Sequence, residues 1–379
     1  MVSLRFKRQI DATTRERNLS TYESTILKEG GLRYAVEKGE NSGEASYQEA
    51  SGAPVETRSP LGYNVGAVTI VFLNISMMVG TGVFSTPAAV LKGTGSVGLA
   101  LIYWFIGFLI SASALAVYLE FASYFPNRSG AEVVYLEQSY PRPRYLFPVT
   151  FAIQTVLLSF SSSNAVVLAE YLFRISNHTP SNWQIKGVAI AGYTLAFLFV
   201  VFNTKWSYRI SNAIGIVKLL TLIFIAITGF VVLGGHVHRV PHPTANFHNA
   251  FHGFEGTQAS AYGVTNALVK IVYSYQGYAN AFNVVNEIKN PVRSVRNYGG
   301  LSLLITAILY TLANIAYFAA VPKEDLVKSK QIAASLFFEN TFGSGGAVKG
   351  LNFLIALSAF GNLVAVLLGQ ARVIRECGR

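Results

Sequence analysis

Two long apolar stretches of the sequence are interrupted by residues that disfavour a continuous helix. The first contains the run Val79-Gly80-Thr81-Gly82-Val83-Phe84, with Pro87 close behind it. Each glycine weakens a helix by about 1 kcal/mol relative to alanine. The second contains the polar and aromatic run Tyr273-Ser274-Tyr275-Gln276-Gly277-Tyr278. A helix that breaks at such points leaves backbone N–H and C=O groups available for a ligand.

The two breaks suit opposite charges. A half helix that begins near Gly82 would direct its first N–H groups and the positive end of its dipole at an anion. Carbonyl groups released at Tyr275–Gly277 would accept hydrogen bonds from a cation, so a zwitterion fits the pair. Close helix packing is the alternative explanation of the two glycines, but breaks in matching positions favour a binding site. The predicted substrate-binding residues are Val79, Gly80, Thr81, Gly82, Tyr273, Ser274, Tyr275, Gln276, Gly277 and Tyr278.

Lys218 is the third residue with clear chemical potential. It lies in the apolar run Ile216–Leu220, and no opposite charge is close to it in the sequence. A lysine at membrane depth is energetically costly, so we expect it to face the interior of a helix bundle. We predict that Lys218 takes up and releases a coupling proton. The alternative is a permanent cation that bonds to carbonyl groups of the first broken helix.

The sequence lacks the common motifs of enzyme active sites. It contains no nucleophile with an adjacent base, no His-Glu metal motif and no Gly-rich loop that ends in Lys-Ser or Lys-Thr. Five of the six histidines lie at irregular spacing within residues 235–262, and the single cysteine, Cys377, is far from them. We therefore predict no catalytic activity, no cofactor and no metal site.

The elements that carry these residues follow from composition. Of the 379 residues 51% are hydrophobic and 13% are charged, which excludes an ordinary soluble protein. A membrane-spanning helix needs about 20 mainly apolar residues. The sequence therefore predicts an all-α polytopic membrane protein whose spans are Val65–Leu91, Val97–Tyr124, Phe147–Ile175, Gly187–Asn203, Ser211–Leu233, Gly263–Asn286, Tyr298–Val321 and Lys349–Gln370.

Charge predicts the topology. Residues 1–63 hold nine basic and nine acidic residues and no apolar core of a signal peptide, so we expect a disordered cytoplasmic tail. The remaining 21 basic residues lie mostly in short gaps between the spans, which argues against nucleic-acid binding. With the N-terminus inside, the cytoplasmic segments hold 20 of the 30 Lys and Arg and the outer segments hold eight.

Several motifs in register give residues 64–379 a resemblance to a known family. The chain resembles the amino acid/polyamine/organocation superfamily, in particular the L-type amino acid transporter branch and its fungal methionine-permease-like members. Besides the first break, the matching motifs are Gly95–Ala100, Ser129-Gly130 followed by Tyr135, Asn286–Pro291, and Phe360-Gly361-Asn362 followed by Gln370-Ala371-Arg372.

The resemblance implies a five-plus-five inverted-repeat fold, with the substrate at the bilayer midplane between discontinuous helices one and six. Gly80, Thr81 and Gly82 match the carboxylate-binding segment of the family, and Tyr273 matches its aromatic gate. Proton-coupled relatives carry a lysine on helix five, as here. Tyr278 stands where relatives often have Trp, and Ala279 where many have Asn, so the specificity for the substrate side chain stays open.

The same resemblance divides the chain. Residues 64–234 would form the first repeat, residues 235–262 an extracellular loop, and residues 263–379 an incomplete second repeat of helices six to eight. Two further helices would close that repeat, so the sequence looks C-terminally truncated relative to the family.

The expected function is secondary-active transport of neutral amino acids, with methionine favoured, by proton-coupled alternating access in the plasma membrane. The alternatives are a non-transporting amino acid sensor and an inactive fragment of a permease. The expected partners are the amino acid, the proton and the lipid bilayer. Similarity to fungal permeases adds ubiquitin-ligase machinery that acts on Lys7, Lys28 or Lys38, which are otherwise plain solvated charges.

Overall fold

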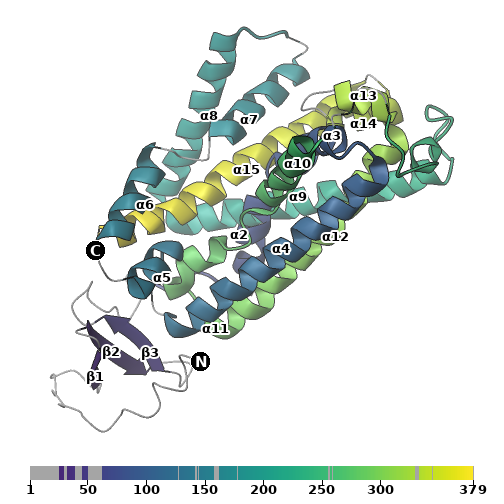
Figure 1. The fold of residues 1–379 in the computed structure, drawn as a ribbon. Coiled ribbons are helices and arrows are strands. Elements are labelled where there is room, and N and C mark those ends of the chain that lie inside the picture. Colours follow the sequence, from purple (N-terminus) through teal and green to yellow (C-terminus); the bar gives the residue numbers. More distant parts are fainter. Residues whose placement is uncertain are drawn as a thin grey trace.

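The structure is a computed structural model in which a helical bundle accounts for most of the chain (Figure 1). It describes the backbone of three strands in the tail and residues 62–378 apart from positions 127, 141, 142, 144, 158–161, 177, 255, 256, 258, 329–332 and 344. Lys7 lies outside the described residues, whereas Lys28 and Lys38 lie in strands.

The N-terminal tail, for which we expected no regular structure, contains a three-stranded antiparallel sheet. Its strands are β1 (Thr25–Glu29), β2 (Leu32–Lys38) and β3 (Ala45–Glu49), in that spatial order. Apolar residues alternate with polar ones along part of β2, which is the pattern of a strand.

The first predicted span is broken where its glycines indicate. Helix α2 (Ala67–Met78) and helix α3 (Gly82–Thr94) meet at an angle of 43°. Helix α4 (Val97–Tyr124) follows and is continuous. A short helix, α5 (Glu132–Ser139), then lies in a loop where the sequence analysis expected no helix.

The rest of the first half forms three more predicted spans. Helices α6 (Leu146–Leu157) and α7 (Ser162–Ile175) cover the third, and the residues between them lie outside the described part. Helix α8 (Asn182–Phe202) begins with a capping box. The side chain of Asn203 caps α9 (Thr204–Leu233).

The second half begins with a short 3-10 turn, η1 (Ala245–Phe247), and the predicted second break. Helix α10 (Ala261–Tyr275) ends there and is followed by a 3-10 segment, η2 (Asn280–Glu287). The chain continues through α11 (Pro291–Ser294), the π-helical η3 (Val295–Gly299) and α12 (Gly300–Ala320). Two short helices, α13 (Lys323–Lys328) and α14 (Ala333–Phe342), precede α15 (Gly346–Cys377).

The helices satisfy the requirements of a multi-pass membrane protein. By length and apolar composition, five continuous helical stretches of the described chain can cross a membrane, and the bent pair α2/α3, taken as one span, makes a sixth. These five are α4, α8, α9, the stretch from α11 to α12, and α15. Within the described chain, the third and sixth predicted spans consist of shorter pieces. The predicted all-α membrane fold with a broken first span is confirmed.

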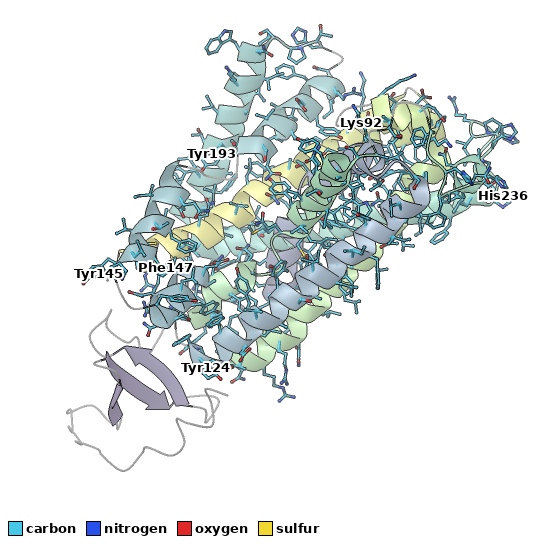
Figure 2. The ribbon with its side chains drawn as sticks, viewed as in Figure 1. Lys92, Tyr124, Tyr145, Phe147, Tyr193 and His236 are labelled. Atoms are coloured by element: carbon cyan, nitrogen blue, oxygen red, sulfur yellow. The ribbon has the colours of Figure 1, made fainter. Side chains whose placement is uncertain are left out.

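Segments that connect the helices lie at both ends of the bundle. Figure 2 shows Lys92 and His236 at one end and Tyr124 and Tyr145 toward the other. The segment after α3 and the segment after α9 therefore share one side of the bundle.

Helix α15 is the central packing element of the bundle. It packs against α2, α7, α8 and α9, and Figure 1 shows it in yellow alongside α7 and α8. Small residues allow close contacts, as is common between membrane helices. A side chain at Gly361 of α15 would collide with Ile214, and one at Gly229 of α9 would collide with Ala316 of α12.

Candidate functional site

The break after α2 leaves its last carbonyl groups without amide donors from a continuing helix. Lys218 of α9 replaces two of those donors, because its Nζ atom lies 2.6 Å from the carbonyl oxygens of both Ser76 and Val79. The hydroxyl of Ser358 on α15 also donates to Val79, at 3.1 Å. Lys218 is fully buried, and no carboxylate within the described chain forms an ion pair with it. Its charge is therefore stabilised by backbone carbonyls.

Two other side chains bind the carbonyl groups between Ser76 and Val79. The hydroxyl of Tyr310 on α12 donates to Met78 at 2.6 Å, and Nδ2 of Asn362 on α15 donates to Met77 at 2.5 Å. Three helices thus hold the end of α2 in its broken geometry.

The opposite side of the same break starts a new helix. The carbonyl of Thr81 accepts from the amides of Phe84 and Ser85, at 3.2 and 3.0 Å, and so opens α3. The N–H groups of the first turn, which includes Gly82 and Val83, have no acceptor inside their own helix. They provide the site with donors and with the positive end of a helix dipole.

The second break touches the first. Gly277 follows α10 with φ +120°, and a Cβ atom there would lie 2.7 Å from Cγ of Met77 and 2.8 Å from the amide nitrogen of Met78. A Cβ atom on Gly82 would lie 2.6 Å from Oγ of Ser274. Each break therefore needs a glycine where it meets the other.

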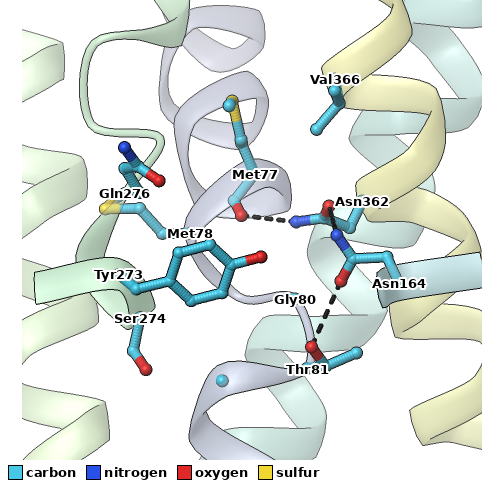
Figure 3. A pocket seen from close by; sticks show the side chains of 11 residues that line it. Met77, Met78, Gly80, Thr81, Asn164, Tyr273, Ser274, Gln276, Asn362 and Val366 are labelled. Atoms are coloured by element: carbon cyan, nitrogen blue, oxygen red, sulfur yellow. Dashed lines mark hydrogen bonds between the residues drawn. The ribbon is translucent and has the colours of Figure 1, made fainter. Parts of the chain in front are cut away.

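A small cavity of about 50 Å³ lies between the two breaks. Figure 3 shows Tyr273 on one wall, with Asn164 and Asn362 facing it from the other. The hydroxyl of Thr81 donates to Oδ1 of Asn164 at 3.3 Å, and Nδ2 of Asn164 donates to Oδ1 of Asn362 at 2.8 Å. The lining residues are Met77, Met78, Gly80, Thr81, Gly82, Asn164, Tyr273, Ser274, Gln276, Asn362 and Val366, none of which carries a charge.

Comparison with known families decides what kind of chain holds this cavity. The amino acid permease family matches residues 65–379, which is most of the sequence. The chain belongs to that family. That family consists of transporters and not of enzymes.

The chain is similar to several curated transporters. It is 38% identical to the high-affinity methionine permease of Saccharomyces cerevisiae over 315 residues, which cover 83% of this chain and 54% of that protein. It is 29% identical to the low-affinity methionine permease of the same yeast, over 84% of this chain and 58% of that protein. It is 26% identical to the human cystine/glutamate transporter, over 80% and 59%. The chain thus spans little more than half the length of these relatives.

The structure brings six of the ten predicted site residues to the cavity. These are Gly80, Thr81, Gly82, Tyr273, Ser274 and Gln276.

The other four predicted residues lie beside the cavity without lining it. The carbonyl of Val79 is bound by Lys218, and Gly277 packs on the end of α2. Tyr275 is buried with its ring 6.0 Å from that of Trp104, and the ring of Tyr278 lies 6.0 Å from that of Tyr118.

Sequence reasoning missed five lining residues of the permease: Met77, Met78, Asn164, Asn362 and Val366. A usable signal existed for Asn362, because an amide in the middle of an apolar span is costly unless it has a partner or a role. Asn164 gives the same signal on α7. The face that each helix turns toward the cavity was the missing information.

Two buried ion pairs connect α15 to η2 and to the segment before α5. Glu287, at the end of η2, is fully buried and accepts from Arg372 of α15 at 2.9 Å and from the hydroxyl of Tyr208 at 3.2 Å. Arg128, ahead of α5, lies 2.6 Å from Glu376 of α15. We call these residues the buried ion-pair network. They connect the second break to α15, α9 and the segment before α5.

Proposed function

We propose that the permease binds and transports neutral amino acids, with methionine as the favoured substrate, by proton-coupled alternating access. We place it in the plasma membrane with its N-terminus in the cytoplasm. One observation carries the proposal: two helix breaks touch each other and line a common cavity that has helix N–H groups on one side. Paired breaks of this kind mark the binding sites of many secondary transporters.

The cavity offers different binding groups to the carboxylate and to the ammonium group of an amino acid. The α-carboxylate would bind the first-turn N–H groups of α3 beside Gly80 and Gly82. The ammonium group would lie near the negative, carbonyl ends of α2 and α10.

The walls favour an uncharged side chain. Met77, Met78 and Val366 contribute apolar surface, and none of the lining residues could neutralise a charged side chain. Two yeast relatives of this chain bear the name methionine permease. Both facts favour a neutral, thioether-sized substrate.

Lys218 is the proposed proton-coupling residue. In its charged form it makes two charge-assisted hydrogen bonds to the end of α2, and such bonds are about twice as strong as neutral ones. Loss of the proton weakens both bonds at once and allows α2 to move. Proton occupancy is thereby linked to the position of one wall of the cavity.

Uptake of a panel of labelled amino acids at two external pH values tests the proposal. We expect methionine uptake to rise at the lower pH and to be inhibited by neutral amino acids but not by glutamate or lysine. The variant Lys218→Gln should lose this pH dependence, whereas Lys270→Gln, which alters another lysine in an apolar helix, should keep it. Full pH-dependent uptake by Lys218→Gln would refute the coupling role, and binding without uptake would indicate a sensor.

A further inference from the structure

Tyr310, near the middle of α12, contacts the ends of both broken helices. Its hydroxyl oxygen lies 2.6 Å from the carbonyl oxygen of Met78 and 3.0 Å from that of Ser274. Met78 is the last residue of α2, and Ser274 lies one residue before the end of α10. Carbonyls in a last turn lack amide partners from their own helix, so a single side chain serves two half helices.

The ring of Tyr310 is fixed by aromatic neighbours. Its centroid lies 5.5 Å from that of Trp104 on α4 and 5.2 Å from that of Tyr275 on α10. The hydroxyl of Tyr275 in turn donates to the carbonyl of Trp104 at 3.3 Å. Tyr310 is itself fully buried. The phenol oxygen therefore has little freedom to leave its two acceptors.

The hydroxyl of Tyr310 has one hydrogen and two carbonyl acceptors. A tyrosine hydroxyl carries one hydrogen, so Tyr310 can donate to only one of the two carbonyls at a time, while the carbonyl of Met78 also accepts from the amide of Gly80 at 2.8 Å. Both Met78 and Ser274 line the cavity, whereas no described residue of α12 does. A change in the distance between these two carbonyls is therefore a change in the cavity.

We infer that Tyr310 is a positioning residue that sets the spacing between the two half helices at the cavity. Its hydrogen can pass from one carbonyl to the other, so the link persists while the ends of α2 and α10 shift relative to each other. The effect on substrate binding rests on the proposed function, but the link between the helices does not.

The same helix provides a matched control. Tyr317 lies about two turns further along α12 and is also fully buried. Its hydroxyl has no hydrogen-bond partner among the residues that the structure describes. A Tyr→Phe change at either position removes one oxygen from the core, but only the change at 310 removes the link.

The first measurement needs no ligand. Spin labels would be attached to cysteines introduced at Val68 on α2 and Tyr262 on α10, both exposed, in the full chain with Cys377→Ser. We expect Tyr310→Phe to broaden the distance distribution between the labels and Tyr317→Phe to leave it as in the parent. An unchanged distribution in Tyr310→Phe, or equal broadening in both variants, would overturn the inference.

The second measurement is equilibrium binding of labelled methionine to the same proteins. Tyr310→Phe should weaken binding by about tenfold, as expected for one lost buried hydrogen bond, and Tyr317→Phe should not. Incorporation of p-aminophenylalanine at position 310 restores an N–H donor at the same place, so it should recover both spacing and affinity. If Tyr310→Phe fails to fold, the p-aminophenylalanine protein still tests the inference. A distance distribution like that of the parent would support the link between α2 and α10, and a broadened distribution would refute it. A broadened distribution in Tyr310→Phe, together with a parent chain that binds no amino acid, would support the link and contradict the proposed function.

Discussion

Single residues hold backbone groups in positions that a regular helix would not allow. Lys218, Tyr310 and Asn362 come from three different helices, and each donates to carbonyls at the end of α2. An unpartnered buried carbonyl costs about 1–3 kcal/mol. The geometry of the first break therefore depends on side chains far away in the sequence.

Asn362 offers a direct test of this dependence. Asn362→Ala removes the donor to Met77 and the acceptor for Asn164, so we expect methionine affinity to fall by about tenfold, or 1.4 kcal/mol. Asn352 is buried on the same helix, and its Oδ1 atom has no partner within the described chain. Asn352→Ala is the control and should bind normally. Equal losses in both variants, measured by equilibrium binding, would contradict a specific role for Asn362.

Gly277 tests the contact between the two breaks. Gly277→Ala places a Cβ atom against Met77 at φ +120°, and such backbone strain costs about 1–3 kcal/mol. We expect a clear drop in thermal unfolding temperature and loss of binding. In contrast, Gly187→Ala in α8 meets nothing within 4 Å and should be neutral or slightly stabilising. A Gly277→Ala protein as stable as the parent would show that the breaks are not in contact.

At the scale of elements, the buried ion-pair network joins η2 to α15 through Glu287 and Arg372. Removal of one partner of a buried ion pair costs about 3–5 kcal/mol, because the other charge stays buried. Glu287 would be in that position without Arg372. The alternating access that we propose would require η2 and α15 to part, so the network should control how often the end of the bundle near Arg372 opens.

The variant Arg372→Met tests the network. We expect the end of the bundle near Arg372 to open more often. Opening would be measured by maleimide labelling of Cys377, the single cysteine. A shift of 1.4 kcal/mol in the opening equilibrium corresponds to about tenfold faster labelling. Arg209→Met is the control, because Arg209 is exposed and stacks on Trp206. If both variants label at the rate of the parent, the network does not control opening.

Elements were predictable from the sequence where the signal is local. Gly80 and Gly82 indicated the first break and Gly277 the second, because a glycine at a break acts through its own backbone. Which side of each helix faces the cavity was not predictable. Helices such as α4 and α9 are apolar on nearly all sides, so no polar stripe identifies the side that faces the cavity. Asn362 was missed for that reason, because α15 is likewise apolar on most sides. Short elements such as α5 depend on contacts with the rest of the fold.

At the scale of the whole molecule, the described helices converge on the two breaks. Helix α3 packs against α10, α2 packs against α9 and α15, and the cavity lies where these contacts converge. A ligand in the cavity would therefore contact both broken spans. The central claim is that this contact needs both charged ends of an amino acid.

Competition against labelled methionine tests that claim most directly. Methioninol lacks the carboxylate and 3-(methylthio)propionate lacks the ammonium, while both keep the thioether side chain. Each lost charge-assisted hydrogen bond is worth about 1.5–3 kcal/mol, so each analogue should compete at least about tenfold less well than methionine itself. If either analogue competes as well as methionine, the two breaks do not bind the two ends of one substrate.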